Sequence, residues 1–180
     1  SPEAFKFHAA YKFQKLVNCF LKIFSIQTIG NQVLSTEGSV DYGVYHLKTP
    51  MLIILGHSDC GAIKAYMKGF EEESYNIKRE LDFLQPAIRQ YFGGEDFEKR
   101  LSLVIEENID YQVNVACKKY KDLVHNGTLT IVGMYYDFAN DFGHGQGRVM
   151  IVNVNKKKKE KRKKKPKQKK KKKKRLMNFF

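Results

Sequence analysis

The chain has 180 residues, of which 42% are hydrophobic, so it is long enough for one globular domain with a core of ordinary size. Its formal net charge of +14 is concentrated between Lys156 and Arg175, where 17 basic residues stand with a single acid. The remaining residues carry 16 bases and 18 acids, which excludes a strongly basic folded body.

The chain begins with a pattern typical of a helix. Residues 3–20 carry apolar side chains at near-helical spacing and predict an amphipathic helix. Its apolar positions are Phe5, Ala9, Phe13, Leu16 and Phe20. Residues 23–29 are short and β-prone and are followed by the turn signal Gly-Asn, so we expect a strand there. A short helix is expected over 40–47.

The middle of the chain predicts a buried strand between helices. Residues 51–55, Met-Leu-Ile-Ile-Leu, form an unbroken apolar run, as is typical of a strand buried on both faces of a parallel sheet. A helix is expected over 62–68, and residues 70–100 are charged and helical in part. Apolar residues then recur at three- and four-residue steps from Val104 to Val124, which predicts a long amphipathic helix.

Two further strands are expected after the long helix, over 129–134 and 148–154, with a Gly-rich turn between them. Strands that alternate with helices predict an α/β fold. We expect three layers, in which helices flank a mostly parallel central sheet.

From Lys156 the sequence is low-complexity lysine. Like charges repel, and such a segment cannot form a core, so we expect a disordered basic tail. The predicted organisation is a helical arm over 1–22, an α/β domain over 23–155 and a lysine-rich tail over 156–180.

The cysteines and the hydropathy bear on the compartment. Cys19, Cys60 and Cys117 are an odd and sparse set, which indicates a reducing compartment rather than a disulfide framework. No apolar run approaches the roughly 20 residues that a membrane-spanning helix needs, and no secretory signal is recognisable. We therefore expect a cytoplasmic location, for a chain that opens on Ser1 as a fragment or a processed product would.

The residues that carry chemistry follow the apolar run, in the string Gly-His-Ser-Asp-Cys-Gly-Ala at 56–62. His57 and Cys60 thus stand three residues apart at the carboxyl end of a buried strand, where open α/β sheets form ligand crevices. Imidazole and thiolate are both good zinc ligands, and a strand-to-helix turn can aim them at one point. By itself, a His-x-x-Cys pair is a weak signal.

The string resembles the second zinc motif of the β-class carbonic anhydrases, and four other segments resemble that family in the same order. They are the β-prone stretch 23–31, the stretch 38–47 (Gly-Ser-Val-Asp-Tyr-Gly-Val-Tyr-His-Leu), Glu107-Asn108 with Gln112-Val113, and the late strand within 127–137. Five matches in the same order argue against coincidence.

The resemblance implies a carbonate dehydratase, a zinc lyase that hydrates CO2 reversibly to bicarbonate. Zinc held by two Cys and one His lowers the pKa of a bound water and gives hydroxide near neutral pH. By position, His57 and Cys60 would be two of the three protein ligands. The resemblance also implies a homodimer or a higher homo-oligomer, and an apolar CO2 pocket formed in part across its interface. The pocket residues implied by position are Phe24, Ile29, Tyr42 and Gly61.

The first zinc motif of the family, Cys-x-Asp-Ser-Arg, is absent from the sequence. In the family its Cys is the third protein ligand, and its Asp–Arg pair orients the metal-bound water. Cys19 lies only five residues before Phe24, whereas two neighbouring parallel strands need a crossover of about a dozen residues or more. We therefore expect Cys19 on the apolar stripe of the first helix rather than at the metal.

Three functions remain open on the sequence. The first is a zinc lyase whose missing ligand reflects an error in the gene model or the sequencing. The second is an inactive relative that keeps the fold and the dimer surface. The third is binding of nucleic acid or an anionic membrane by the lysine-rich tail through charge alone.

Overall fold

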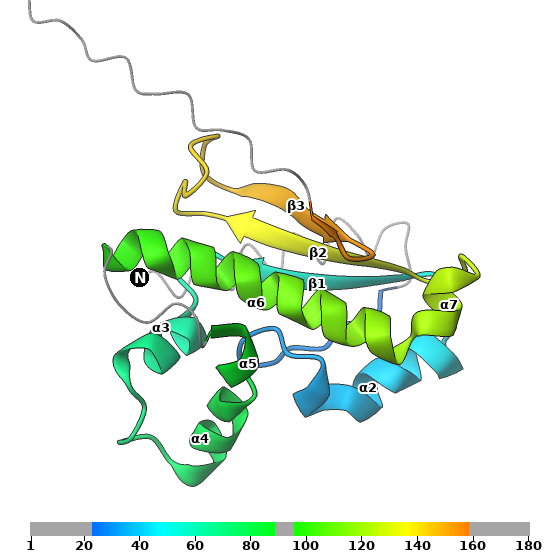
Figure 1. Cartoon of the computed structure of the whole chain (residues 1–180), viewed down its shortest axis with the longest axis horizontal. Helices are drawn as coiled ribbons and strands as arrows, with labels where there is room; N and C mark the ends of the chain where they lie inside the picture. The colour runs from blue at the N-terminus through cyan, green and yellow to red at the C-terminus, as the bar shows by residue number, and fades with distance from the viewer. Residues whose placement is uncertain (1–22, 89–95, 159–180) are drawn as a thin grey trace, which may run out of the picture.

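The structure is a computed structural model that describes residues 23–88 and 96–158 (Figure 1). A four-stranded sheet runs in the order β1-β2-β3-β4. β1 and β2 are parallel, and the β2–β3 and β3–β4 pairs are antiparallel. The predicted α/β class is confirmed, although the sheet is mixed and its described strands include one parallel pair. The strands are β1 (Met51–His57), β2 (Thr130–Asp137), β3 (Arg148–Val154) and β4 (Lys157–Lys158).

Helices precede the sheet and connect its two parallel strands (Figure 1). The expected helices over 40–47 and 62–68 are present, and the charged stretch 70–100 is helical in part. The expected long helix over 104–124 is instead divided into two helices at Tyr120. The helical elements are η1 (Leu34–Thr36), α2 (Glu37–Asp41), the π-helical turn η2 (Tyr42–His46), α3 (Gly61–Lys68), α4 (Tyr75–Asp82), α5 (Gln85–Ile88), α6 (Phe97–Lys119) and α7 (Lys121–His125). No helix among these described residues is both long and apolar enough to cross a membrane.

The long helix α6 lies across one face of the sheet and forms most of the core with it. The Asp96 side chain caps the helix by accepting a hydrogen bond from the Glu98 amide at 3.2 Å. Two glycines allow α6 to lie close to the sheet. A Cβ atom added to Gly56 would lie 2.7 Å from Cδ1 of Ile109, and one added to Gly133 would lie 2.7 Å from its Cγ2. The glycines of β1 and β2 therefore form the surface on which Ile109 packs.

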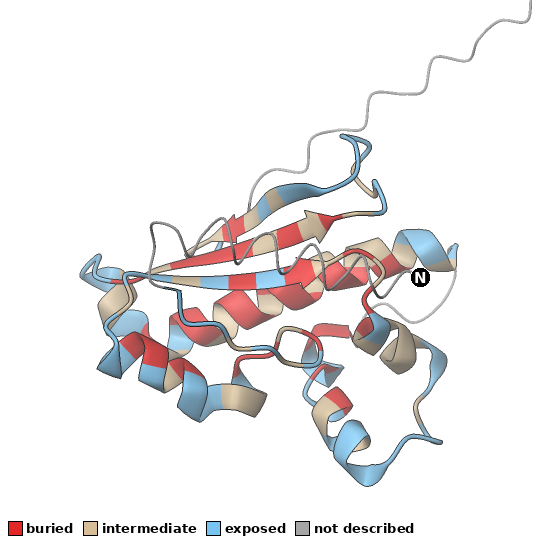
Figure 2. Cartoon of the chain, turned by 180° about the vertical axis from the view of Figure 1, so that it is seen from behind, coloured by how far each residue is buried: buried red, intermediate tan, exposed pale blue. Residues whose placement is uncertain are grey.

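The first strand is buried on one face only, which corrects the expectation of burial on both faces. Ile54 and Gly56 are buried beneath α6, whereas Met51, Ile53 and Leu55 are 50%, 43% and 39% exposed. The reason is that successive side chains of a strand point to opposite faces, and the described helices cover one of them. Leu55 pairs in register with Met134 of β2, which in turn pairs with the exposed Ile151 of β3. Figure 2 shows this alternation of burial along the strands.

The expected strand over 23–29 is wrong, because these residues adopt no regular structure. A strand needs a hydrogen-bonded neighbour, and within the described residues β1 pairs with β2 alone. The segment is held by its side chains instead. Ile26 packs against the part of the core that contains Val40 and Val44, and the ring of Phe24 lies 5.7 Å from that of Tyr42.

The first residues of the predicted lysine-rich tail continue the sheet. Asn155 and Lys156 both have positive φ, 47° and 69°, and form a two-residue turn that returns Lys157–Lys158 along β3 as β4. Such left-handed pairs match the twist of a hairpin, and Asn tolerates the conformation better than most residues. The rest of the tail, the 3–20 helix and Cys19 lie outside the described residues.

Candidate metal site

A tight turn at the carboxyl end of β1 brings His57 and Cys60 together. His57 ends β1, and Cys60 stands at the N-terminus of α3. Between them Asp59 has φ 58°, a left-handed conformation that is uncommon for residues other than glycine but more accessible to Asp and Asn. The turn places the imidazole of His57 within hydrogen-bonding reach of the Cys60 thiol. The sequence-based pairing of these two side chains is therefore present in the structure.

The surroundings of Cys60 favour its thiolate. Burial by itself raises the pKa of the thiol, but the hydrogen bond and the charge of His57 act in the opposite direction. The backbone amides of Ile63 and Ala62, in the first turn of α3, add to this effect. The net result is a pKa for Cys60 below its ordinary value, as suits a metal ligand.

The ring of His57 is fixed on two sides. Its Nδ1 lies 2.7 Å from the carbonyl oxygen of Ser58, which can only accept, so Nδ1 carries the proton. When the ring is neutral, its lone pair therefore resides on Nε2, the nitrogen with which it would bind a metal. Phe138, from the chain just after β2, stacks on the imidazole with ring centroids 5.9 Å apart and an angle of 24° between the planes.

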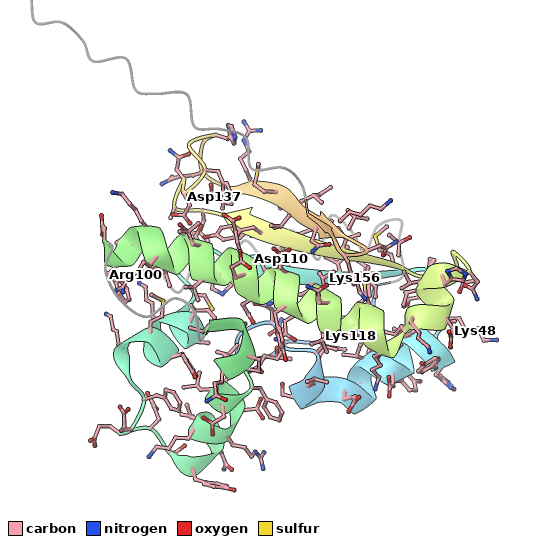
Figure 3. All side chains as sticks on the ribbon, in the orientation of Figure 1. Lys48, Arg100, Asp110, Lys118, Asp137 and Lys156 are labelled. Carbon is pink, nitrogen blue, oxygen red and sulfur yellow. The ribbon has the colours of Figure 1, made fainter. Side chains whose placement is uncertain are left out.

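Two buried polar residues beside the turn were not identified from the sequence. Ser58 and Asp137 are both completely buried, and the Ser58 hydroxyl donates to the Asp137 carboxylate at 3.1 Å. Asp137 ends β2 (Figure 3). The signal that could have identified them is topological, because the carboxyl ends of two adjacent parallel strands meet at one edge of the sheet.

The residues that the resemblance implied for a CO2 pocket lie in two places, before β1 and at the start of α3. Phe24, Ile29 and Tyr42 are exposed apolar side chains, and Phe24 contacts Tyr42. Gly61 opens α3, and a Cβ added to it would meet only open space. Cys19 lies outside the described residues.

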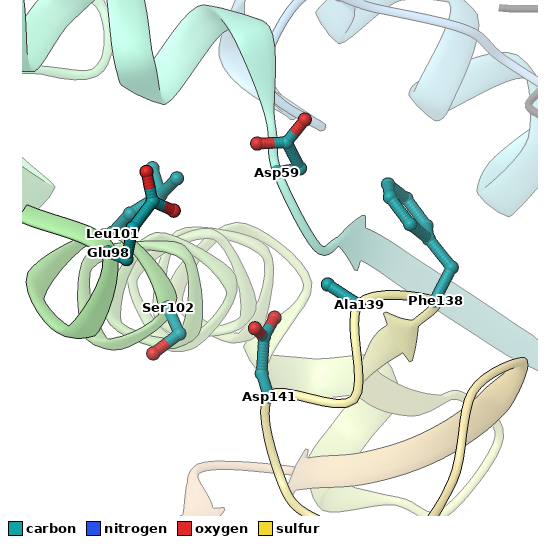
Figure 4. Close-up of a pocket in the computed structure, with 7 residues that line it drawn as sticks. All are labelled: Asp59, Glu98, Leu101, Ser102, Phe138, Ala139 and Asp141. Carbon is teal, nitrogen blue, oxygen red and sulfur yellow. The ribbon is translucent and has the colours of Figure 1, made fainter. Parts of the chain in front are cut away.

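A small pocket of about 170 Å³ lies beside the turn and is lined in part by Asp59 (Figure 4). Three carboxylates, from Asp59, Glu98 and Asp141, stand around it. Neither His57 nor Cys60 lines it. The Asp59 carboxylate is paired with the ammonium of Lys64, and the Asp141 carboxylate accepts the Tyr135 hydroxyl at 2.5 Å. Leu101, Phe138 and Ala139 also line the pocket, so its wall is acidic in part and apolar in part.

The donor pair fits zinc in kind but not in number. Zinc binds imidazole nitrogen and thiolate sulfur, and its catalytic sites take three protein ligands. Within residues 23–88 and 96–158, no group of three His, Cys, Asp or Glu side chains is placed to hold a metal ion. The described residues therefore bring together two donors of the kind that zinc binds, one fewer than such a site requires.

Comparisons with known proteins identify the family of the chain. The family model described as "Carbonic anhydrase" matches residues 18–149. Carbonic anhydrase 2 of Mycobacterium tuberculosis is 23% identical over 121 residues, which cover 63% of this chain and 58% of the relative. A Helicobacter pylori carbonic anhydrase is 28% identical over 134 residues, which cover 64% and 61%. The chain thus spans about three fifths of the length of these relatives.

Solved structures show the same fold. The β-carbonic anhydrase CcaA superposes with a TM-score of 0.64 at 19% identity, over 77% of this chain and 72% of that chain. A Coccomyxa β-carbonic anhydrase in complex with acetazolamide gives 0.60 at 20% identity, over 74% and 62%. A tetrameric β-carbonic anhydrase of Sordaria macrospora gives 0.57 at 19% identity, over 69% and 64%.

Proposed function

Because the chain belongs to the β-carbonic anhydrase family, we propose that His57 and Cys60 are two ligands of a Zn²⁺ site for the reversible hydration of CO2 to bicarbonate. The observation that supports this most directly is the contact of His57 with Cys60 at the carboxyl end of β1. A bound zinc would supply Lewis-acid activation of water. The residues of the chain supply a thiol with a lowered pKa and an imidazole whose proton lies on Nδ1.

The chain as given is expected to bind zinc weakly and to hydrate CO2 slowly or not at all. Two dependable ligands are fewer than the three that catalytic zinc sites take, and the Asp–Arg pair of the missing motif is absent from the sequence. Zinc stoichiometry after dialysis and stopped-flow CO2 hydration test this together. Grafting a Cys-x-Asp-Ser-Arg segment with its crossover ahead of Ile23 should raise both.

Cys60→Ser and Cys19→Ser are the matched variants. We expect Cys60→Ser to abolish the weak zinc binding and Cys19→Ser to leave it unchanged. Hydration at a normal enzyme rate that both substitutions abolish would contradict the proposal, because Cys19 would then reach the metal. Folded protein with neither zinc nor activity would favour the inactive relative.

We further propose that the chain forms a homodimer or a higher homo-oligomer. The supporting observation is an exposed apolar surface along the segments before β1, while one relative in the same fold is tetrameric. Its members include Ile23, Phe24, Ile29, Leu34, Tyr42, Tyr45 and Leu47. Light scattering at micromolar concentration should give at least a dimer, and Phe24→Ser with Tyr42→Ser should shift it toward the monomer. A stable monomer in the unchanged chain would contradict this.

A second candidate function is binding of polyanions by the lysine-rich tail. The basic residues from Lys156 to Arg175 outnumber the acids by 16, and the rest of the chain is slightly acidic. We expect sequence-independent DNA binding that weakens steeply with salt. Truncation after Lys158, which retains β4, should abolish it. Equal binding by the truncated and full chains would contradict the charge explanation.

A further inference from the structure

We propose that Ser58 and Asp137 are positioning residues that hold the turn in which His57 meets Cys60. The inference rests on the proposed function only in taking these two side chains as the metal-binding pair. Ser58 lies between them in the sequence, and Asp137 lies on the neighbouring parallel strand.

Ser58 joins the end of β1 to the end of β2 through five contacts, one of them from its hydroxyl to the carbonyl oxygen of Tyr136 at 3.4 Å. Its amide donates to the carbonyl of Tyr136 at 2.9 Å, and its hydroxyl donates to Oδ1 of Asp137 at 3.1 Å. The same hydroxyl oxygen accepts from the amides of Phe138 and Ala139 at 3.2 and 3.3 Å. The single hydroxyl proton faces two acceptors, of which the Asp137 carboxylate is the nearer, and both acceptor positions of the hydroxyl oxygen are used by backbone amides.

Asp137 anchors Ser58 from the other side. Its carboxylate is completely buried, and it accepts from the Asp141 amide at 2.8 Å and from the Phe142 amide at 3.0 Å, besides the Ser58 hydroxyl. A buried carboxylate is tolerated only with such partners, and bonds to an ionised acceptor are the stronger kind. The carboxylate therefore fixes both Ser58 and the backbone over 138–142.

These contacts lead to both members of the pair. The carbonyl of Ser58 accepts the Nδ1 proton of His57, and Phe138, whose amide is bound by the Ser58 hydroxyl, stacks on the same imidazole. On the other side, Asp59 adopts a left-handed conformation that persists only where the surroundings fix it. Releasing Ser58 would free the ring of His57 and the path of the backbone to Cys60 at once.

Two substitutions disrupt the contact between Ser58 and Asp137 in different ways. Ser58→Ala removes the hydroxyl, and Asp137→Asn keeps the volume but places an amide NH2 against at least one backbone N–H. Ser58→Thr is the conservative variant, because it retains a hydroxyl on the same carbon. Ser102→Ala is the matched control, since the Ser102 hydroxyl bonds to the Lys99 carbonyl within α6.

The first measurement needs no metal. The ¹⁵N spectrum of the imidazole reports which ring nitrogen carries the proton, and we expect the Nδ1–H form of His57 in the full unmodified chain. Ser58→Ala and Asp137→Asn should give a mixture of both tautomers, whereas Ser58→Thr and Ser102→Ala should keep the single form. A structural role confined to stability would leave the tautomer of the folded variants unchanged.

The second measurement is titration with Co²⁺, whose absorption reports thiolate coordination. We expect the affinity to fall about 10–100-fold in Ser58→Ala and Asp137→Asn, as is typical when residues that orient a metal ligand are lost. If Ser58→Ala does not fold, the comparison of Asp137→Asn with Ser58→Thr tests the inference. Folded variants with the tautomer and the Co²⁺ affinity of the unmodified chain would overturn the inference. An unmodified chain that does not bind Co²⁺ contradicts the proposed function instead, and the tautomer then decides on the positioning role.

Discussion

The two faces of the sheet differ in what covers them, although their side chains are equally apolar. On one face, Ile54, Ile131 and Tyr135 are buried beneath α6. On the other, Ile53, Leu55 and Ile151 are exposed within the described part of the chain. An apolar run reports that a strand is suited to burial on both faces, whereas burial itself depends on which other segments are present. Substitutions on the two faces can test this difference.

The largest effect is expected beneath the helix, at Ile109. Its side chain is completely buried between α6 and the glycines of β1 and β2. Ile109→Ala should lower the free energy of unfolding by about 2–5 kcal/mol, because the site loses apolar contacts and retains a cavity. Urea denaturation monitored by circular dichroism measures this loss of stability. A loss below about 1 kcal/mol would mean that α6 packs less closely than the structure shows.

Gly56 offers a smaller effect on the same face. Gly56→Ala places a methyl group 2.7 Å from Cδ1 of Ile109 and should cost about 1–3 kcal/mol through overpacking. The same substitution made in Ile109→Ala should cost much less, because the clashing atoms are gone. Additive effects of the two changes in a double-mutant cycle would contradict this direct contact.

The polar contacts of α6 should contribute a similar or smaller amount to the free energy of unfolding. The Asn108 amide donates to the carbonyl of Gly30 at 2.9 Å and to Oδ1 of Asn31 at 3.3 Å, and its oxygen accepts from Gln112. Asn108→Ala leaves buried partners unsatisfied, at a cost of roughly 1–3 kcal/mol. Hydrogen exchange should show the loss in the turn over 30–33. An exposed amide such as that of Gln85 provides the control, since its loss should leave this turn unchanged.

The smallest effect is expected on the open face. Leu55→Ser and Ile151→Ser should each change the free energy of unfolding by no more than about 0.5 kcal/mol if the face is solvated. Thermal and urea unfolding of the full chain provide the measurement. A loss above about 1 kcal/mol would show that a segment outside the described residues, or a second copy, covers the face in solution.

The sequence predicts elements better than it predicts their surroundings. The apolar runs at 51–55 and 129–134 and the stripe of the long helix identify β1, β2 and α6, because each pattern is a property of the element itself. The prediction of a strand over 23–29 was wrong, because the formation of a strand depends on a hydrogen-bonded neighbour as well as on its own sequence. The hairpin turn at Asn155 and Lys156 was hidden by the lysine composition that follows it.

The candidate site shows the same difference between local patterns and long-range contacts. His57 and Cys60 lie three residues apart, so the sequence predicts their meeting at a strand-to-helix turn. Ser58 and Asp137 are 79 positions apart, and only the parallel register of β1 with β2 brings them into contact. Contacts of this kind are set by the pairing of strands, which no local spacing reveals.

The free edge of β1 has a practical consequence for handling the protein. Within the described residues this strand pairs on one side only, and its sequence Met-Leu-Ile-Ile-Leu-Gly-His contains neither proline nor a lysine or acidic side chain. Natural sheets usually protect an edge with such residues, because bare backbone groups template pairing with another chain. If no other segment of the chain covers this edge, we expect intermolecular strand addition and aggregation at β1 in concentrated preparations. A lysine in place of Ile53, at the centre of the exposed row, would act as a gatekeeper against it.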